Sequence, residues 1–135
     1  MADAVTSQTI QDGARHAILK FTNVSDGTGE AAVVKVDVSA LSADPVSKAA
    51  CTSVSIESIR YSTIGMGIKI FFDATADVLA WEIPADYSDT VDFSDFNGIP
   101  NNAGAGVTGD IAFTTVGAGS GDVYTVVLKV VKQYG

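Results

Sequence analysis

Short segments in which apolar and polar residues alternate, separated by glycine, aspartate and proline, cover most of this chain. A period of two places successive side chains on opposite faces of a strand, so each segment is typical of a β-strand with one buried face. No segment keeps a helical period over several turns. The sequence therefore predicts an all-β protein, and the clearest candidates for the core are Ala17, Leu19, Phe21, Ile68, Ile70, Phe72, Tyr124, Val126, Leu128 and Val130.

The alternation predicts seven to nine short strands, which favours an antiparallel β-sandwich or jelly roll. Ile56 and Ile59 belong to opposite phases of one segment, which predicts a bulge near Ser58. Glycine and aspartate dominate the connections "VSDGTGE" and "VGAGSGD", and both residues accept the positive φ of tight turns. We therefore expect two hairpins, one joining residues 14–23 to 31–40 and one joining residues 110–115 to 123–132.

The length of 135 residues suits a single domain, residues 1–135, with one core. The polar residues 1–12 precede the first clear strand, and we expect them to form an N-terminal arm. Residues 84–109 lack a clear period and form a connection that is long for a compact domain. Because such loops are commonly functional, the arm and this long loop are the expected contact elements.

The chain has 8 Lys and Arg against 16 Asp and Glu, a formal net charge of −8. This charge argues against nucleic acid, whose binding depends on clustered cations, and favours a basic partner surface. Cys51 is the only cysteine, so the chain alone can form neither a disulfide nor a site of several thiolates. We find no signal peptide and no membrane-length apolar run, so we expect synthesis in the cytoplasm and no membrane partner.

Gly104, Gly106 and Gly109 have the spacing G-x-G-x-x-G of dinucleotide-binding folds. In those folds the glycines lead from a strand into a helix, whose N-terminal amides face the pyrophosphate. Here they follow a loop and precede the strand-like "DIAFTT". We therefore interpret them as turn residues or as positions where another backbone comes close, and we predict no bound cofactor.

Aspartates recur at every third residue in "ADYSDTVDFSDF", interleaved with aromatic residues. Three interpretations stay open: a solvated acidic loop held by its aromatics, a surface that docks on a basic partner, or oxygen ligands for Ca²⁺. The EF-hand spacing is absent. The candidate partner-contact residues are Asp86, Tyr87, Asp89, Asp92, Phe93, Asp95 and Phe96.

Few residues suggest chemistry, and we predict that the protein is not an enzyme. His16 is the only histidine, and no G-x-S-x-G motif accompanies it. Trp81 alternates with apolar neighbours and is expected in the core, whereas a carbohydrate-binding module would need Trp81 and Tyr87 exposed as a stacking platform. Lys20 or Lys35, near an asparagine and a buried acid, could form an intramolecular isopeptide bond.

The segments "LKFTN", "SDGTGE" and "AGVTGDI", in this order, resemble small virion structural proteins of tailed bacteriophages. Over residues 9–132 the chain is most similar in character to cement, or decoration, proteins that coat the major-capsid-protein lattice. The resemblance implies a β-sandwich or jelly roll, self-association as a dimer or trimer, the major capsid protein as partner, a place on the capsid exterior, and no catalytic residues. The alternatives are a tail or head-tail component, a carbohydrate-binding β-sandwich module and an enzyme.

Overall fold

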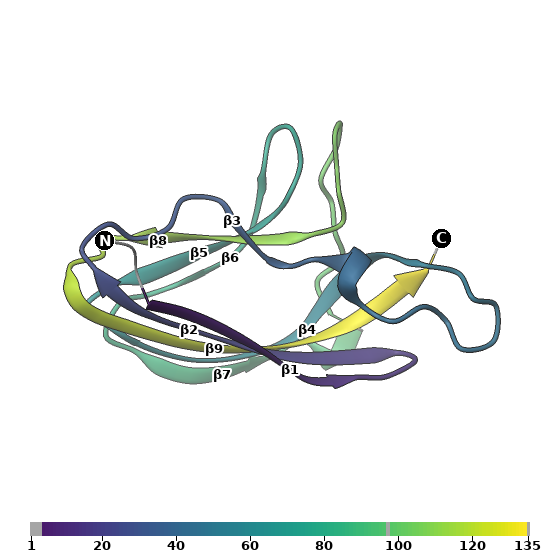
Figure 1. The fold of residues 1–135 in the computed structure, drawn as a ribbon, viewed down its shortest axis with the longest axis horizontal. Coiled ribbons are helices and arrows are strands. Elements are labelled where there is room, and N and C mark those ends of the chain that lie inside the picture. The colour runs from purple at the N-terminus through teal and green to yellow at the C-terminus, as the bar shows by residue number, and fades with distance from the viewer. Residues whose placement is uncertain (1–3, 97, 135) are drawn as a thin grey trace.

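The computed structural model describes residues 4–96 and 98–134, which form an antiparallel β-sandwich (Figure 1). Short 3₁₀ turns, η1 (Val38–Ala40) and η2 (Ser94–Phe96), are the helical elements of these residues. The strands are β1 (Ala4–Asp12), β2 (His16–Asp26), β3 (Val33–Val36), β4 (Cys51–Ile64), β5 (Gly67–Phe72), β6 (Val78–Ile83), β7 (Ser88–Asp92), β8 (Ile111–Val116) and β9 (Ser120–Tyr134).

The strands form a five-stranded sheet in the order β1-β2-β9-β4-β7 and a four-stranded sheet in the order β3-β8-β5-β6. Without β1, the two sheets have four strands each, and the chain passes repeatedly from one sheet to the other. This is the strand order of a jelly roll, to which β1 adds an edge strand. The predicted fold class is therefore confirmed.

Both predicted hairpins are wrong. Strand β2 pairs with β1 and β9, whereas β3 pairs with β8 in the other sheet. Strands β8 and β9 likewise belong to different sheets. The glycine-rich connections do reverse the chain, but turn chemistry does not specify the pairing partner. At both of these connections the chain crosses to the opposite sheet, and the apolar faces of the two sheets bury each other.

The apolar phase of the central strands forms the core between the sheets. The ten core candidates on β2, β5 and β9 are all less than 9% exposed, whereas Trp81, also expected in the core, is only partly buried against it. Phe113 stands at the centre, with Phe21 and Tyr124 packed edge-on against its ring at centroid distances of 5.5 and 6.0 Å. Cys51 is also buried, and burial raises the pKa of its thiol.

A break in register between Ile56 and Ser58 confirms the predicted bulge in β4. The extra residue allows Ile56 and Ile59, which have opposite phases, both to lie fully buried in the core. Valine and leucine at the margins behave differently, since Val34 on β3 and Leu79 on β6 are 44% and 49% exposed. Both lie on edge strands of the four-stranded sheet, and the register places them on its outer face, opposite Ala112 and Phe71 rather than opposite the core residues Phe113 and Ile70.

The two expected contact elements need correction. The described part of the predicted arm is strand β1, which pairs with β2 from Ala4 opposite Val24 to Asp12 opposite Ala17. The free edge of β2 offers backbone hydrogen bonds that an arm would otherwise make with water. The predicted loop 84–109 contains β7 and η2, because residues 88–92 pair with β4. Residues of the expected arm and of the expected loop thus form β1 and β7, the two opposite edge strands of one sheet.

Candidate partner-contact site

The predicted contact residues lie on and around β7. Asp86, Asp89, Asp92 and Asp95 are all exposed, and the side chain of Tyr87 is 52% exposed. These positions remain accessible to a partner.

Phe93 is an exception and corrects the prediction. It is only 7% exposed, and its ring packs edge-on against Trp81 at a centroid distance of 5.0 Å. The side chain of Phe93 therefore fixes the segment to the body of the protein, as the first interpretation of the acidic segment expected. Phe96 belongs to η2, and its side chain lies outside the described residues.

Backbone hydrogen bonds hold the aspartates of this segment. Asp86 lies in the left-handed region at φ 57°, and its Oδ1 accepts a hydrogen bond from the Gly65 amide at 2.7 Å. Asp92 accepts a hydrogen bond from the Ser94 amide, which lowers the pKa of the Asp92 carboxyl. Asp89 and Asp92 belong to strand β7, whereas Asp86 precedes this strand and Asp95 lies in η2. Among residues 4–96 and 98–134, no three His, Cys, Asp or Glu side chains gather as a metal site would require.

The glycine motif serves backbone packing. Gly109 has φ +87°, and a Cβ atom there would lie 1.9 Å from the carbonyl oxygen of Thr52. Gly106 has φ +77°, and a Cβ atom there would lie 2.0 Å from Oγ1 of Thr75. The glycines lead into strand β8 rather than a helix. The interpretation as turn and close-approach residues is therefore confirmed.

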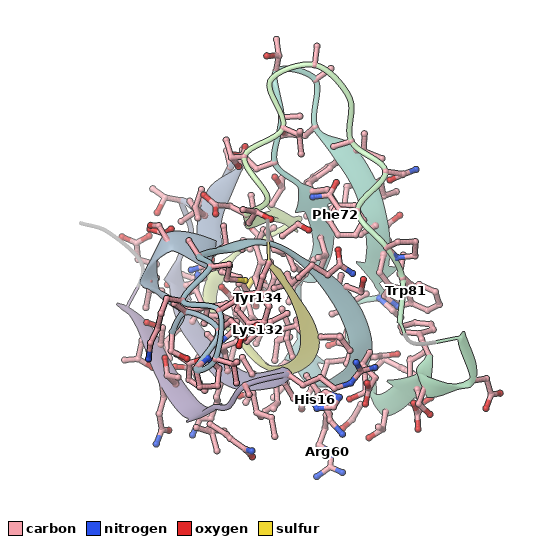
Figure 2. All side chains as sticks on the ribbon, turned by 90° about the vertical axis from the view of Figure 1, so that its right-hand side faces the viewer. His16, Arg60, Phe72, Trp81, Lys132 and Tyr134 are labelled. Atoms are coloured by element: carbon pink, nitrogen blue, oxygen red, sulfur yellow. The ribbon has the colours of Figure 1, made fainter. Side chains whose placement is uncertain are left out.

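His16 belongs to an ion-pair network on the five-stranded sheet. Its Nε2 lies 3.0 Å from Oε2 of Glu57, and Nζ of Lys129 lies 3.0 Å from Oε1 of the same carboxylate. Burial of Glu57 would raise its pKa, but hydrogen bonds from Lys129 and His16 outweigh burial and hold the pKa below its ordinary value. In Figure 2, Arg60 projects away from the fold next to His16.

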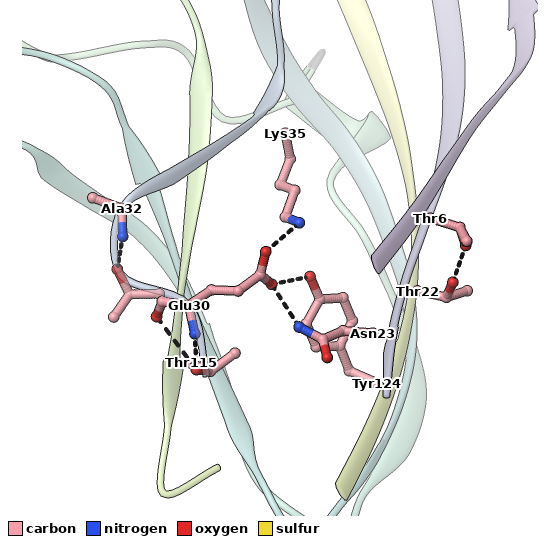
Figure 3. Close-up of polar contacts among 9 residues, drawn as sticks. Thr6, Thr22, Asn23, Glu30, Ala32, Lys35, Thr115 and Tyr124 are labelled. Carbon is pink, nitrogen blue, oxygen red and sulfur yellow. Dashed lines mark hydrogen bonds and ion pairs between the residues drawn. The ribbon is translucent and has the colours of Figure 1, made fainter. Parts of the chain in front are cut away.

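A buried polar cluster joins the two sheets (Figure 3). Lys35 Nζ donates to Oε2 of Glu30 at 2.5 Å, and both side chains are about 5% exposed. The other oxygen of Glu30 accepts hydrogen bonds from Tyr124 Oη at 2.5 Å and Asn23 Nδ2 at 2.9 Å. Of the two lysines considered for an isopeptide bond, the structure thus places Lys35 near an asparagine, with the Glu30 carboxylate between them.

Sequence reasoning missed Glu30 because it lies in a turn-rich connection and gives no periodic signal. Lys35 also occupied the polar phase of its segment. A break in register between Val34 and Val36 alters the phase of β3, and the side chain of Lys35 enters the interior.

A second buried lysine ties the ends of the chain together. Lys132 has a fully buried side chain, and its Nζ donates to Oδ1 of Asp12 at 2.6 Å, to the carbonyl of Gly13 and to Oγ of Ser42. Figure 2 shows Lys132 beside Tyr134 at this end of the sandwich. Burial would raise the pKa of Asp12, but the bonds from Lys132 and Ser42 hold it below its ordinary value.

The fold defines the class of this protein as an antiparallel jelly-roll sandwich with an added edge strand. None of the helical elements in the described residues has the length and apolar character needed to span a membrane. No protein-family model matches the chain, and no curated protein is similar to it.

Two solved structures show a distant similarity. A cupin superfamily protein from Desulfitobacterium hafniense aligns with a TM-score of 0.35 and 13% identity, covering 98% of this chain and 80% of that one. An RmlC-like cupin protein from Desulfovibrio desulfuricans aligns with a TM-score of 0.33 and 9% identity, covering 92% of this chain and 80% of that one. Similarity at this level carries no inference about activity, and the fold assignment depends on the strand pairing alone.

Proposed function

We propose that this chain is a structural virion protein of a tailed bacteriophage, and specifically a cement protein that binds the major capsid protein on the outside of the capsid. It acts by contacting neighbouring shell subunits and holding them together against internal pressure. It uses no catalytic residue and no cofactor for this role.

One observation carries the proposal. The two elements expected to make contacts, the N-terminal segment and the acidic segment, are the opposite edges β1 and β7 of the same five-stranded sheet. An edge strand presents backbone N–H and C=O groups on one side, and these can pair with another chain. One copy can therefore engage two neighbours at once, and repeated engagement on a symmetric shell adds avidity.

The two edges differ in chemistry, which suits two different contacts. Residues 4–11 of β1 carry no charged side chain, and Val5 and Ile10 are 43% and 51% exposed. Edge strands of monomeric proteins commonly carry charge or proline, which block pairing. Strand β7 is acidic and is suited to basic shell surfaces, consistent with the net charge of −8.

The carbohydrate-binding alternative requires Trp81 and Tyr87 to share a platform. Trp81 packs against Phe93, whereas Tyr87 lies next to Tyr61 at a centroid distance of 6.3 Å. The two rings therefore have different neighbours, and the geometry offers this alternative no specific support.

The decisive experiment is the copy number of this polypeptide in purified particles, measured by quantitative mass spectrometry against the major capsid protein. A fixed ratio close to that of the shell subunit supports the cement role. A few copies per particle would indicate a tail or head-tail component, and absence from particles would overturn a virion function.

The edge β1 is tested by Val5→Lys, which places a charge on an exposed side chain of this strand. We expect the variant to fold normally but to occupy fewer shell sites. The control is Val46→Lys, on a valine that is 89% exposed in the connection between β3 and β4. Equal occupancy of the two variants would remove β1 from the contact.

A further inference from the structure

Two cations lie on the outer face of the five-stranded sheet. Lys20 on β2 and Arg60 on β4 both lie opposite Val127 of the strand β9 between them. Directly opposite residues share a face, so the three side chains form one row across the sheet. Within the described part of the chain, neither cation lies at ion-pair distance from a carboxylate. This is notable in a chain with 16 acidic residues.

A shallow hollow of about 350 Å³ adjoins this row. Ile10, Ile18 and Val127 supply its apolar lining, and Arg60 and Lys129 its cationic rim. Lys129 is already paired with Glu57, so Arg60 is the cation of this rim that is available. Such a hollow suits an aromatic or aliphatic side chain flanked by carboxylates.

A matching element is present on the same chain. In the turn between β6 and β7, Tyr87 is 52% exposed and lies between Asp86 and Asp89, both exposed and without an ion pair among the described residues. Asp86 and Asp89 thus place two carboxylates beside an exposed aromatic ring, and Lys20 and Arg60 lie two strand spacings, about 10 Å, apart on the sheet. The turn therefore carries the aromatic side chain and the negative charges that complement the hollow and its neighbouring cations.

The turn that carries Tyr87 does not lie over the hollow of its own molecule. Tyr87 lies next to Tyr61, which is buried on the inner face of the sheet, whereas its neighbour Arg60 points to the outer face. The complement must therefore come from another copy.

We propose that this outer face is the docking site for a second copy of the chain, with Tyr87 of one copy in the hollow of the next. Asp86 and Asp89 then face Lys20 and Arg60. Because two different surfaces meet, the contact is heterologous, and it closes into a ring or continues as a row. The inference rests on the proposed function, which requires copies to be close together on a lattice.

The test uses the purified full chain and two charge-reversal variants, analysed by sedimentation velocity and light scattering. The face variant is Lys20→Glu/Arg60→Glu, and the turn variant is Asp86→Lys/Asp89→Lys. We expect the wild type to form an oligomer that dissociates as salt is raised, and each variant alone to show a fall in mass by a factor of about two or more. An equimolar mixture of the variants restores association, since the turn of the face variant meets the intact face of the turn variant.

The control is Lys48→Glu/Lys69→Glu, which makes the same charge change away from the outer face and should associate like the wild type. Tyr87→Ser provides a second turn variant that leaves the hydrogen bond of Asp86 intact. A wild type that remains monomeric, or an oligomer that persists in both the face variant and Tyr87→Ser, overturns the proposal. Copy number in particles is measured separately, so absence from particles identifies failure of the proposed function instead.

Discussion

Replacing Lys35 by methionine tests the physical basis of the polar cluster between the sheets. The change keeps the apolar stem of the side chain but leaves the Glu30 carboxylate, about 6% exposed, without its ammonium partner. Removing one member of a buried ion pair costs about 3–5 kcal/mol, because the remaining charge is uncompensated. Tyr124 and Asn23 still donate hydrogen bonds to Glu30, so we expect the lower end of this range, about 3 kcal/mol.

For a domain of this size, a loss of about 3 kcal/mol lowers the thermal midpoint by roughly 10 °C. The free energy of unfolding is measured by urea denaturation, followed by tryptophan and tyrosine fluorescence, with the slope against urea checked for each variant. The control is Lys69→Met, which removes a cation of β5 that has no ion pair in the described residues, and which should cost at most about 0.5 kcal/mol.

The double variant Glu30→Gln/Lys35→Met separates the charge effect from packing. Because it removes both charges, we expect it to recover at least half of the loss seen in Lys35→Met. Equal destabilisation of the single and double variants would refute the reasoning. So would a cost for Lys35→Met no larger than that of the Lys69→Met control.

Two further predictions concern other parts of the fold, and a third concerns the covalent state of the polar cluster. Gly109→Ala should lower the free energy of unfolding by about 2 kcal/mol or more, because the φ of Gly109 is +87° and the Thr52 carbonyl leaves no room for a Cβ. Gly104→Ala is the control, since the space around Gly104 is open, and it should change the free energy of unfolding by at most about 0.5 kcal/mol in the same denaturation assay. The folded state lowers the pKa values of Glu57 and Asp12, so their contribution to stability should be fully present above the ordinary values of 4.5 and 3.8 and should be lost as pH falls through the lower folded-state values. Glu57→Gln should therefore reduce the dependence of the free energy of unfolding on pH in the acid range. An unchanged pH dependence would contradict the assignment. The intact mass of the purified protein should equal that of the sequence, because the Glu30 carboxylate lies between Lys35 and Asn23 and pairs with the lysine. A mass lower by one ammonia would instead indicate an isopeptide bond.

The sequence predicted what depends on local pattern. The faces of β2, β5 and β9 follow directly from alternation, and the bulge beside Ser58 follows from a phase change within one segment. What it did not predict depends on distant pairing. Strand β1 looked like a free arm because its residues are mostly polar, and only its pairing with β2 defines it as a strand.

In the candidate site, too, the local pattern predicted some features, and pairing between distant segments determined the others. The aspartates near β7 were named as contact candidates from their spacing and charge, but the burial of Phe93 depends on Trp81, which lies twelve residues earlier on β6. The row formed by Lys20, Val127 and Arg60 gave no sequence signal, since its members come from three distant segments. Register across a sheet is set by long-range packing, which a single sequence does not display.

The position of β9 has a consequence for how the protein is made. This last strand lies between β2 and β4 and pairs with both along most of its length. A ribosome must therefore release nearly the whole chain before the larger sheet can assemble, and folding depends on contacts between distant segments, which are slow to form. A nascent chain that ends before residue 120 leaves β2 and β4 with open inner edges, which are prone to aggregate. Incomplete products that lack β9 thus cannot form the central pairings of this sheet.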